Sequence, residues 1–161
     1  MKVGITGHQQ FDDLSVLPWI EETIREKLGS CSELCGLSSL AKGADQLFAG
    51  VLLELGGRLE AVLPFGDYEA TFEKPEDLAR FRELLARCSA VTTLEFAGSN
   101  EQSYFVAGQY VADNSQLLIA VWNGRPAAGL GGTGDIVSYA RRVGKAVYQI
   151  NPCSRTASDV A

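Results

Sequence analysis

The chain has 161 residues, of which 46% are hydrophobic and 21% charged, a composition that excludes a disordered or fibrous chain and suits one compact domain. Its formal net charge is −6 and its isoelectric point is near 4.8. Because nucleic-acid binding depends on basic side chains that neutralise phosphates, this charge disfavours a nucleic-acid partner.

Membrane, metal and disulfide chemistry are also disfavoured by the sequence. No apolar run approaches the ~20 residues of a membrane-spanning helix, and the start, Met-Lys-Val-Gly-Ile-Thr-Gly, has a strand pattern. We therefore expect a cytoplasmic protein without a membrane partner. The four cysteines lack Cys-x-x-Cys spacing and His8 is the one histidine, so reduced thiols and no metal are expected. A metal or redox pair of Cys31 and Cys35 is the alternative.

Strand and helix patterns alternate along the chain. Short apolar segments bounded by turn residues predict six strands, at 2–6, 34–38, 59–63, 90–94, 117–122 and 146–150. Apolar residues spaced by three and four predict helices between them, at 17–28, 47–55, 78–88, 104–112 and 136–140.

Several residues mark where these helices begin and end. Ser15 is a plausible N-cap for the first helix, and Ser99 and Gln102 have the spacing of a capping box. The pair Gly56-Gly57 and the later Gly144 are typical helix stops.

Strands that alternate with helices predict a mostly parallel sheet, because right-handed crossovers place helices on both of its faces. We expect an α/β, three-layer, doubly wound Rossmann-like fold with about six strands, in one nucleotide-binding domain at residues 1–152. Residues 153–161 are small and polar and are expected to form a flexible tail.

In such sheets ligands bind outside the carboxyl ends of the strands, so the loops that follow strands hold the candidate site. The candidate ligand-binding residues are Thr6, Gly7 and His8 after the first strand; Ser39, Lys42, Gly43 and Asp45 after the second; and Arg125, Gly131, Gly132 and Thr133 after the fifth.

The glycine-rich segment 129–134 is the most informative of these loops. Glycines let backbone N–H groups approach a phosphate, and the N-terminus of the following helix adds roughly half a positive charge. Neither the P-loop pattern nor GxGxxG after the first strand is present, so an NTPase or an NAD dehydrogenase is not supported. A tight turn without a ligand is the alternative explanation for these glycines.

Other positions also have two interpretations. His8 either contacts a ligand or braces its loop. Asp45 either accepts a hydrogen bond from a ribose hydroxyl or caps loop amides. Phe65 and Tyr68 either stack on a base or close the edge of the core.

Two segments in order carry a resemblance to a known group. Residues 38–45, Ser-Ser-Leu-Ala-Lys-Gly-Ala-Asp, are similar to the Ser-Gly-Leu-Ala-Arg-Gly-x-Asp stretch of the DNA-processing protein A family. Residues 131–133, Gly-Gly-Thr, with a following helix and Gly-Lys-Ala-Val at 144–147, resemble the GGT or GGxGT segment that this family shares with the Lonely-guy phosphoribohydrolases. From Val3 to Pro152 the chain resembles the Rossmann-like superfamily that contains both families and the nucleotide-sensing SLOG domains.

Departures from these motifs favour one branch of the superfamily. Lonely-guy hydrolases carry Pro-Gly-Gly-x-Gly-Thr-x-x-Glu, whose glutamate is implicated in cleaving the N-glycosidic bond, and Ile136 stands at that place here. Asp135, one residue earlier, is the candidate catalytic residue, but one residue turns a helix by ~100°. The DNA-processing proteins bind single-stranded DNA through a basic groove, which an acidic chain does not suit. The resemblance is closest to the SLOG sensing branch.

We therefore expect a pocket that binds a nucleotide or nucleotide-derived ligand, of ADP-ribose or nucleoside monophosphate type. The expected partner is this small molecule, without nucleic acid or a cofactor, and homo-oligomer formation is left open. The alternative is a nucleoside 5'-monophosphate phosphoribohydrolase in which Asp135 acts on the N-glycosidic bond, although a binding protein is favoured over an enzyme. An oligomeric scaffold with a vestigial pocket is a third hypothesis.

Overall fold

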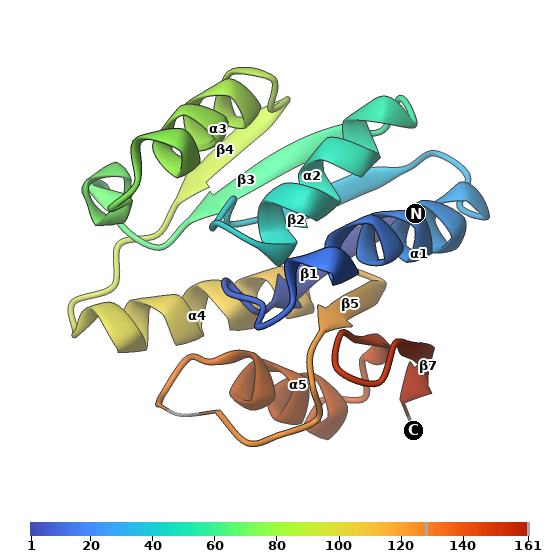
Figure 1. Ribbon diagram of the computed structural model, residues 1–161. Helices are drawn as coiled ribbons and strands as arrows, with labels where there is room; N and C mark the ends of the chain where they lie inside the picture. Colours follow the sequence, from blue (N-terminus) through green and yellow to red (C-terminus); the bar gives the residue numbers. More distant parts are fainter. Residues whose placement is uncertain (128, 161) are drawn as a thin grey trace.

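The computed structural model describes residues 1–127 and 129–160 (Figure 1). The strands in these residues are β1 (Lys2–Gly7), β2 (Cys35–Ser38), β3 (Arg58–Leu63), β4 (Ala90–Thr93), β5 (Leu117–Val121), β6 (Ala146–Asn151) and β7 (Thr156–Val160). The helices are α1 (Leu17–Gly29), α2 (Ala44–Glu54), α3 (Pro75–Ala86), α4 (Asn100–Asp113) and α5 (Thr133–Arg142), with short 3-10 turns η1 (Leu14–Val16) and η2 (Tyr68–Thr71).

Within the described residues the seven strands form one sheet, in the order β4-β3-β2-β1-β5-β6-β7. Neighbouring strands from β4 to β6 are parallel, and β7 is antiparallel to β6. The chain builds outward from β1 to β4 and then crosses back through α4 to place β5 on the other side of β1 (Figure 1). The crevice between β1 and β5 is therefore the topological switch point, where sheets of this kind bind ligands.

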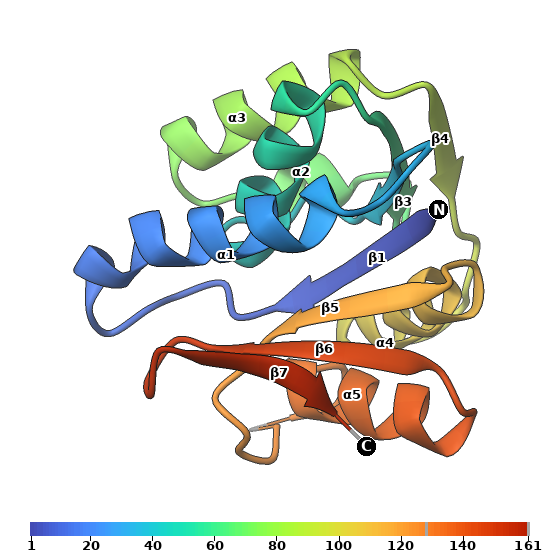
Figure 2. The same cartoon turned by 90° about the vertical axis from the view of Figure 1, so that its right-hand side faces the viewer.

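Helices cover both faces of the sheet (Figure 2). One hydrophobic cluster packs α1, α2 and α3 against one face, and a second packs α4 and α5 against the other. All five residues of β5 are buried, because a central parallel strand is covered on both sides. The predicted three-layer, doubly wound, Rossmann-like fold is confirmed.

The helix ends show which of the predicted capping residues are present in the structure. The Ser99 side chain accepts from the Gln102 N–H and the Gln102 side chain accepts from the Ser99 N–H, so the predicted capping box is present. Ser15 is not the N-cap that was expected. Asp13 accepts from the Ser15 N–H at 2.9 Å and caps η1, which continues directly into α1.

The prediction of a flexible tail is wrong for residues 156–160, which form β7 and raise the number of strands from the expected six to seven. Lys27 also reaches this strand, with its Nζ 3.6 Å from Asp159 Oδ1. An edge strand is held by its backbone ladder and needs little buried side-chain surface. Because the residues of β7 are mostly polar, their sequence pattern did not predict a strand. Residue 161 lies outside the described residues.

Candidate functional site

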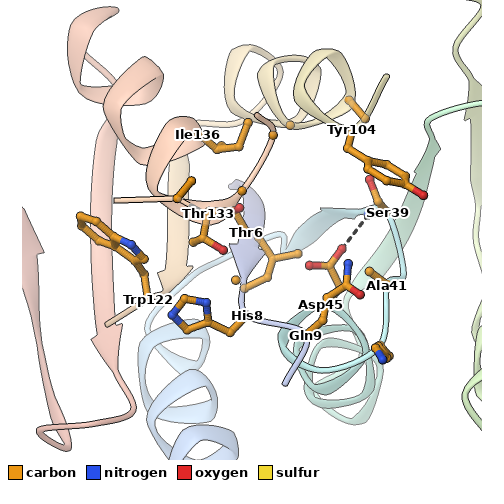
Figure 3. Close-up of a pocket in the computed structure, with 18 of the residues that line it drawn as sticks. Thr6, His8, Gln9, Ser39, Ala41, Asp45, Tyr104, Trp122, Thr133 and Ile136 are labelled. Carbon is orange, nitrogen blue, oxygen red and sulfur yellow. Dashed lines mark hydrogen bonds between the residues drawn. The ribbon is translucent and has the colours of Figure 1, made fainter. Parts of the chain in front are cut away.

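A cavity of about 740 Å³ opens at the carboxyl ends of the parallel strands (Figure 3). The loops after β1, β2 and β5 line it, together with η2, α4 and the first turn of α5. Ten of the predicted binding residues lie in its wall: Thr6, Gly7, His8, Ser39, Lys42, Asp45, Arg125, Gly131, Gly132 and Thr133. Gly43 instead lines an adjoining groove of about 590 Å³.

The end of β1 is pressed between α2 and β5. A Cβ atom at Gly7 would lie 2.4 Å from the Ala44 Cβ and 3.1 Å from the Val121 carbonyl oxygen. Glycine is the residue that permits this approach. The preceding residue, Thr6, stands in the middle of the cavity wall (Figure 3).

His8 joins the two strands of the switch point. Its backbone N–H donates to the Val121 carbonyl at 3.0 Å, and its Nε2 accepts from the Asn123 N–H at 3.1 Å. An accepting Nε2 requires the neutral imidazole with its proton on Nδ1. Burial lowers the pKa of His8, which favours the same neutral form. The ring therefore braces its loop while it also forms part of the cavity wall.

The loop after β2 is locked against the loop after β1. Gly43 has a φ of +83°, and a Cβ atom there would lie 2.5 Å from the His8 carbonyl oxygen. The same carbonyl accepts from the Ala44 N–H at 3.0 Å. Lys42, next to this contact, lines both the cavity and the adjoining groove. Two predicted loops thus form a single continuous wall.

Asp45 lies in the first turn of α2 and is 7% exposed. Its Oδ2 accepts from the Ser38 Oγ and from the Ser39 N–H, both at 3.2 Å (Figure 3). Burial raises the pKa of this carboxyl from 3.8 to about 7, although these hydrogen bonds oppose the rise. The loop-capping interpretation of Asp45 is therefore correct, and contact with a ribose hydroxyl stays a prediction.

The glycine-rich segment after β5 forms a turn at the start of α5. Gly131 has a φ of +86°, and its N–H donates to the Asp135 Oδ2 at 3.1 Å. Gly132 is the N-cap residue and Thr133 begins the helix. The Asp135 and Ile136 N–H groups donate to the Gly132 carbonyl, and the positive end of the helix dipole at this turn favours an anion.

Arg125 lies on the exposed segment that precedes this turn. Its backbone is fixed from both sides, because its carbonyl accepts from the Trp122 Nε1 at 2.8 Å and its N–H donates to the Asn123 Oδ1 at 3.0 Å. The residue lines the cavity near the turn, as predicted. Its guanidinium adds a positive charge to this end.

The candidate catalytic residue is placed differently. Asp135 is absent from the cavity wall of the described chain, and its carboxylate holds the Gly131 N–H. Ile136 does line the cavity and is 2% exposed. It packs so closely on α4 that a Cβ atom at Gly108 would lie 2.3 Å from its Cδ1. An apolar side chain therefore occupies the place of the hydrolase glutamate.

Several lining residues were missed at the level of sequence. Tyr104 of α4 and Trp122 after β5 both border the cavity (Figure 3). Phe65 packs against the hydrophobic core and is not among the lining residues of the described chain, which fits closing of the core edge and not stacking on a base. Tyr68 does line the cavity, but its ring is buried edge-on against Phe72 and Phe81. No spacing pattern marks Tyr104 or Trp122, since the crossover through α4 brings them to the site.

Metal and membrane features were searched in the same part of the chain. Within residues 1–127 and 129–160, no group of three or more His, Cys, Asp or Glu side chains is placed to hold a metal ion. The cysteines, Cys31 and Cys35 included, are free thiols. None of the described helices has both the length and the apolar character needed to span a membrane.

Comparison with known proteins gives structural matches alone. No protein-family model and no curated protein sequence matches the chain. DNA processing protein A from Streptococcus pneumoniae superposes with a TM-score of 0.68 at 21% identity, over 92% of this chain and 49% of that one. DNA processing protein A from Helicobacter pylori, described with a single-stranded DNA binding mode, gives 0.64 at 16% identity, over 92% and 64%. The chain thus spans about half to two thirds of these proteins.

A third structural neighbour with the same fold is described as a carrier of the molybdenum cofactor. The molybdenum cofactor carrier protein from Chlamydomonas reinhardtii has a TM-score of 0.57 at 17% identity, over 92% of this chain and 74% of that one. Identity at this level establishes the fold and leaves function to the site.

The expectation of no nucleic-acid partner is contradicted by these neighbours. A protein described as binding single-stranded DNA has this fold. The sequence argument used the net charge of the whole chain, whereas nucleic-acid binding depends on local basic groups, and net charge does not report their placement. The resemblance inferred from the loop motifs is confirmed at the level of the fold: the chain has the Rossmann-like fold of DNA processing protein A and the molybdenum cofactor carrier protein.

Proposed function

We propose that the protein binds a nucleotide or nucleotide-derived ligand, of ADP-ribose or nucleoside monophosphate type, in the cavity at the carboxyl ends of the strands. One observation carries this proposal: the switch point, the loop after β2 and the start of α5 border a single cavity. Its volume of about 740 Å³ lies in the ~300–1,000 Å³ range of small-molecule sites.

The two ends of the cavity differ in charge. The first turn of α5 and Arg125 offer a helix N-terminus and a guanidinium, which together suit a phosphate. The opposite end carries the buried carboxyl of Asp45 and the aromatic Tyr104. A ligand with an anionic group at one end and hydroxyls and a ring at the other fits this division, and nucleotides have this composition.

The geometry favours binding over hydrolysis of the N-glycosidic bond. Glycosidic cleavage uses carboxylates beside the bond that breaks. Ile136 occupies the lining position, and the Asp135 carboxylate is held in the Gly131 turn. We expect Asp135→Asn, whose carboxamide oxygen can still accept from Gly131, to retain ligand binding. Release of free base by the wild-type protein from AMP or GMP, abolished in this variant, would instead establish the hydrolase.

A thermal-shift panel of AMP, GMP, ADP-ribose, cyclic nucleotides and NAD tests the proposal. A ligand at ~100 times its dissociation constant adds about 2.7 kcal/mol to the free energy of unfolding, which raises the midpoint of a domain of this size by roughly 5–10 °C. A selective shift is the expected result. A panel without any shift at millimolar concentration would refute the proposal, and a single-stranded oligonucleotide in the same panel tests the other ligand class.

Variants of the two cations locate the bound ligand. Lys42→Ala and Arg125→Ala each remove a positive charge from the cavity wall, and we expect affinity to fall by about tenfold, the value of one charge-assisted hydrogen bond. Lys74→Ala and Arg141→Ala are matched controls, because neither residue lines this cavity in the described chain. Equal losses in variants and controls would show that the ligand binds elsewhere.

A further inference from the structure

Two buried polar side chains lie at the end of the cavity away from α5. Asp45 follows β2 and is 7% exposed, and Tyr68 begins η2 after β3 and is 5% exposed. Both line the cavity. Their electrostatic contact is close enough that the charge of Asp45 contributes to raising the pKa of the Tyr68 phenol, after burial as the main cause.

The Tyr68 hydroxyl is an unmatched hydrogen-bonding group. Its ring is enclosed by Phe72 and Phe81, with ring centroids at 5.4 and 5.6 Å. No described residue accepts from or donates to its hydroxyl, although every fully enclosed side-chain nitrogen or oxygen in the described chain has a partner. The hydroxyl therefore reaches the open cavity. A hydroxyl that is open to the cavity pairs with water or with a ligand atom that displaces the water, so a ligand can supply its partner.

Asp45 retains capacity for a further donor. The Ser38 hydroxyl and the Ser39 N–H both reach Oδ2, and the Ala41 N–H also acts on the carboxyl. A carboxylate has about four lone-pair sites, so three donors leave room for another. A carboxylate that accepts and a phenol that donates thus face the same space.

Few chemical groups can form hydrogen bonds with both Asp45 and Tyr68. The ionised form of Asp45 would repel a phosphate oxygen, and an apolar group would leave the Tyr68 hydroxyl without a partner. A hydroxyl donates one hydrogen bond and accepts another, so it pairs with both. Asp45 follows β2, one strand spacing of ~4.8 Å from the β1 crevice. In a nucleotide the ribose is bonded directly to the phosphate, which places its hydroxyls nearer to that crevice than the base.

We infer that Asp45 and Tyr68 form a subsite that recognises the ribose hydroxyls of the ligand, with Asp45 accepting from a hydroxyl and Tyr68 donating to one. This inference rests on the proposed function and specifies the sugar that the cavity selects. The pair would distinguish ribonucleotides from their deoxy forms. Neither residue takes part in binding the phosphate.

Titration calorimetry with AMP, 2'-deoxy-AMP, 3'-deoxy-AMP and inosine monophosphate tests the inference, and the same series is run with GMP and its 2'-deoxy form. A site built around a hydroxyl rejects a ligand that lacks it, so we expect the ribonucleotide to bind at least about tenfold more tightly than a deoxy form. The ratio of the two affinities is the quantity to compare among variants.

Tyr68→Phe removes the hydroxyl and keeps the ring packing, and Asp45→Ala removes both acceptor oxygens of the carboxyl. We expect both variants to bring the ratio to within about twofold, while the preference for AMP over adenosine is kept. Tyr110→Phe is the matched control, because Tyr110 lies outside the cavity wall of the described chain. Melting temperatures of all variants establish that each is folded.

The outcomes separate this inference from the function on which it rests. A wild-type ratio near one, or a ratio that Tyr68→Phe leaves unchanged, overturns the subsite while nucleotide binding stands. If Tyr68→Phe instead abolishes a preference between AMP and inosine monophosphate, the pair reads the base edge and the ribose assignment is wrong. If no nucleotide binds, the proposed function fails and the subsite fails with it.

Discussion

The two sides of the cavity are built in different ways. On one side, the start of α2 packs closely against the end of β1 and the loop after it, and the backbone of His8 is hydrogen-bonded to both α2 and β5. On the other side, the segment from Asn123 to Gly132, described apart from residue 128, is mostly exposed and is held by short-range bonds such as Gly131 to Asp135.

The two sides of the cavity therefore contribute differently to the stability of the protein and to ligand binding. The β1–β2 side is continuous with the hydrophobic core, so its shape is maintained by the same packing that stabilises the protein. The Asn123–Gly132 side is held by hydrogen bonds within its own turns. Substitutions in exposed loops of this kind lower the stability of the protein little. We expect substitutions on the first side to lower stability and those on the second side to affect ligand affinity more.

The largest expected effect is the pH dependence that Asp45 gives to the β1–β2 side. Its pKa is raised in the folded protein to about 7 from an ordinary 3.8, so the folded state holds a proton that the unfolded chain has lost. Its stabilising contribution is complete below pH ~3.8 and is lost as the pH rises to 7, by about 1.4 kcal/mol for each pH unit between these values.

Urea denaturation from pH 4.5 to 8 measures this effect in the wild type and in Asp45→Asn. We expect the variant to gain stability relative to the wild type as the pH rises, because its amide does not ionise. His8, whose pKa is lowered, acts in the opposite sense and loses its contribution as the pH falls below ~6.5, but it is common to both proteins. A constant difference between the two across this range would contradict the prediction.

Gly43→Ala tests the contact between the two loops directly. Its φ of +83° disfavours a side chain, and the new Cβ would meet the His8 carbonyl oxygen at 2.5 Å. We expect a loss of about 2–3 kcal/mol, which lowers the melting temperature by roughly 4–12 °C. Gly66→Ala is the control, because nothing lies within 4 Å of its Cβ position and its φ is ordinary. Equal stability of the two variants would show that the loops are not locked.

Gly131→Ala makes the corresponding change on the other side. Its φ is +86° and the new Cβ would lie 2.8 Å from the Glu101 carbonyl oxygen, so a loss of about 1–2 kcal/mol is expected. Because the turn lines the cavity and sets the position of the start of α5, we expect nucleotide affinity to fall by about tenfold as well. Gly129→Ala, whose Cβ would meet only the Glu101 Oε1 at 3.7 Å, is the control. Unchanged affinity in Gly131→Ala would exclude this turn from the ligand site.

The elements that sequence reasoning predicted well carry strong local signals. The capping box at Ser99 and the apolar run of β5 depend on neighbouring residues in the chain, and both are present in the structure. β7 was missed because its ladder with β6 is made by backbone atoms, which any sequence possesses. The η1 turn was missed because Asp13 and Ser15 are both good caps and two residues apart.

In the candidate site, too, local sequence signals predicted some features and left others unpredicted. Gly7 and Gly131 could be singled out because their neighbours in the sequence follow a strand or precede a helix. The hydrogen bond from Asn123 to His8 Nε2 joins residues 115 positions apart, and no pattern in the sequence encodes it. The unpaired hydroxyl of Tyr68 likewise becomes evident from the packing of η2 beneath the cavity.

The amino-acid sequence by itself therefore determined the alternation of strands and helices, the parallel sheet and the loops that hold the site, because periodicity, capping and glycine act over a few residues. The tertiary structure decided which side chains meet. Strand order places β5 beside β1 and register sets which residues face one another, so the nearness of Asp45 to Tyr68 and the packing of Ile136 against Gly108 depend on contacts between distant segments. Such contacts form when the whole sheet is assembled.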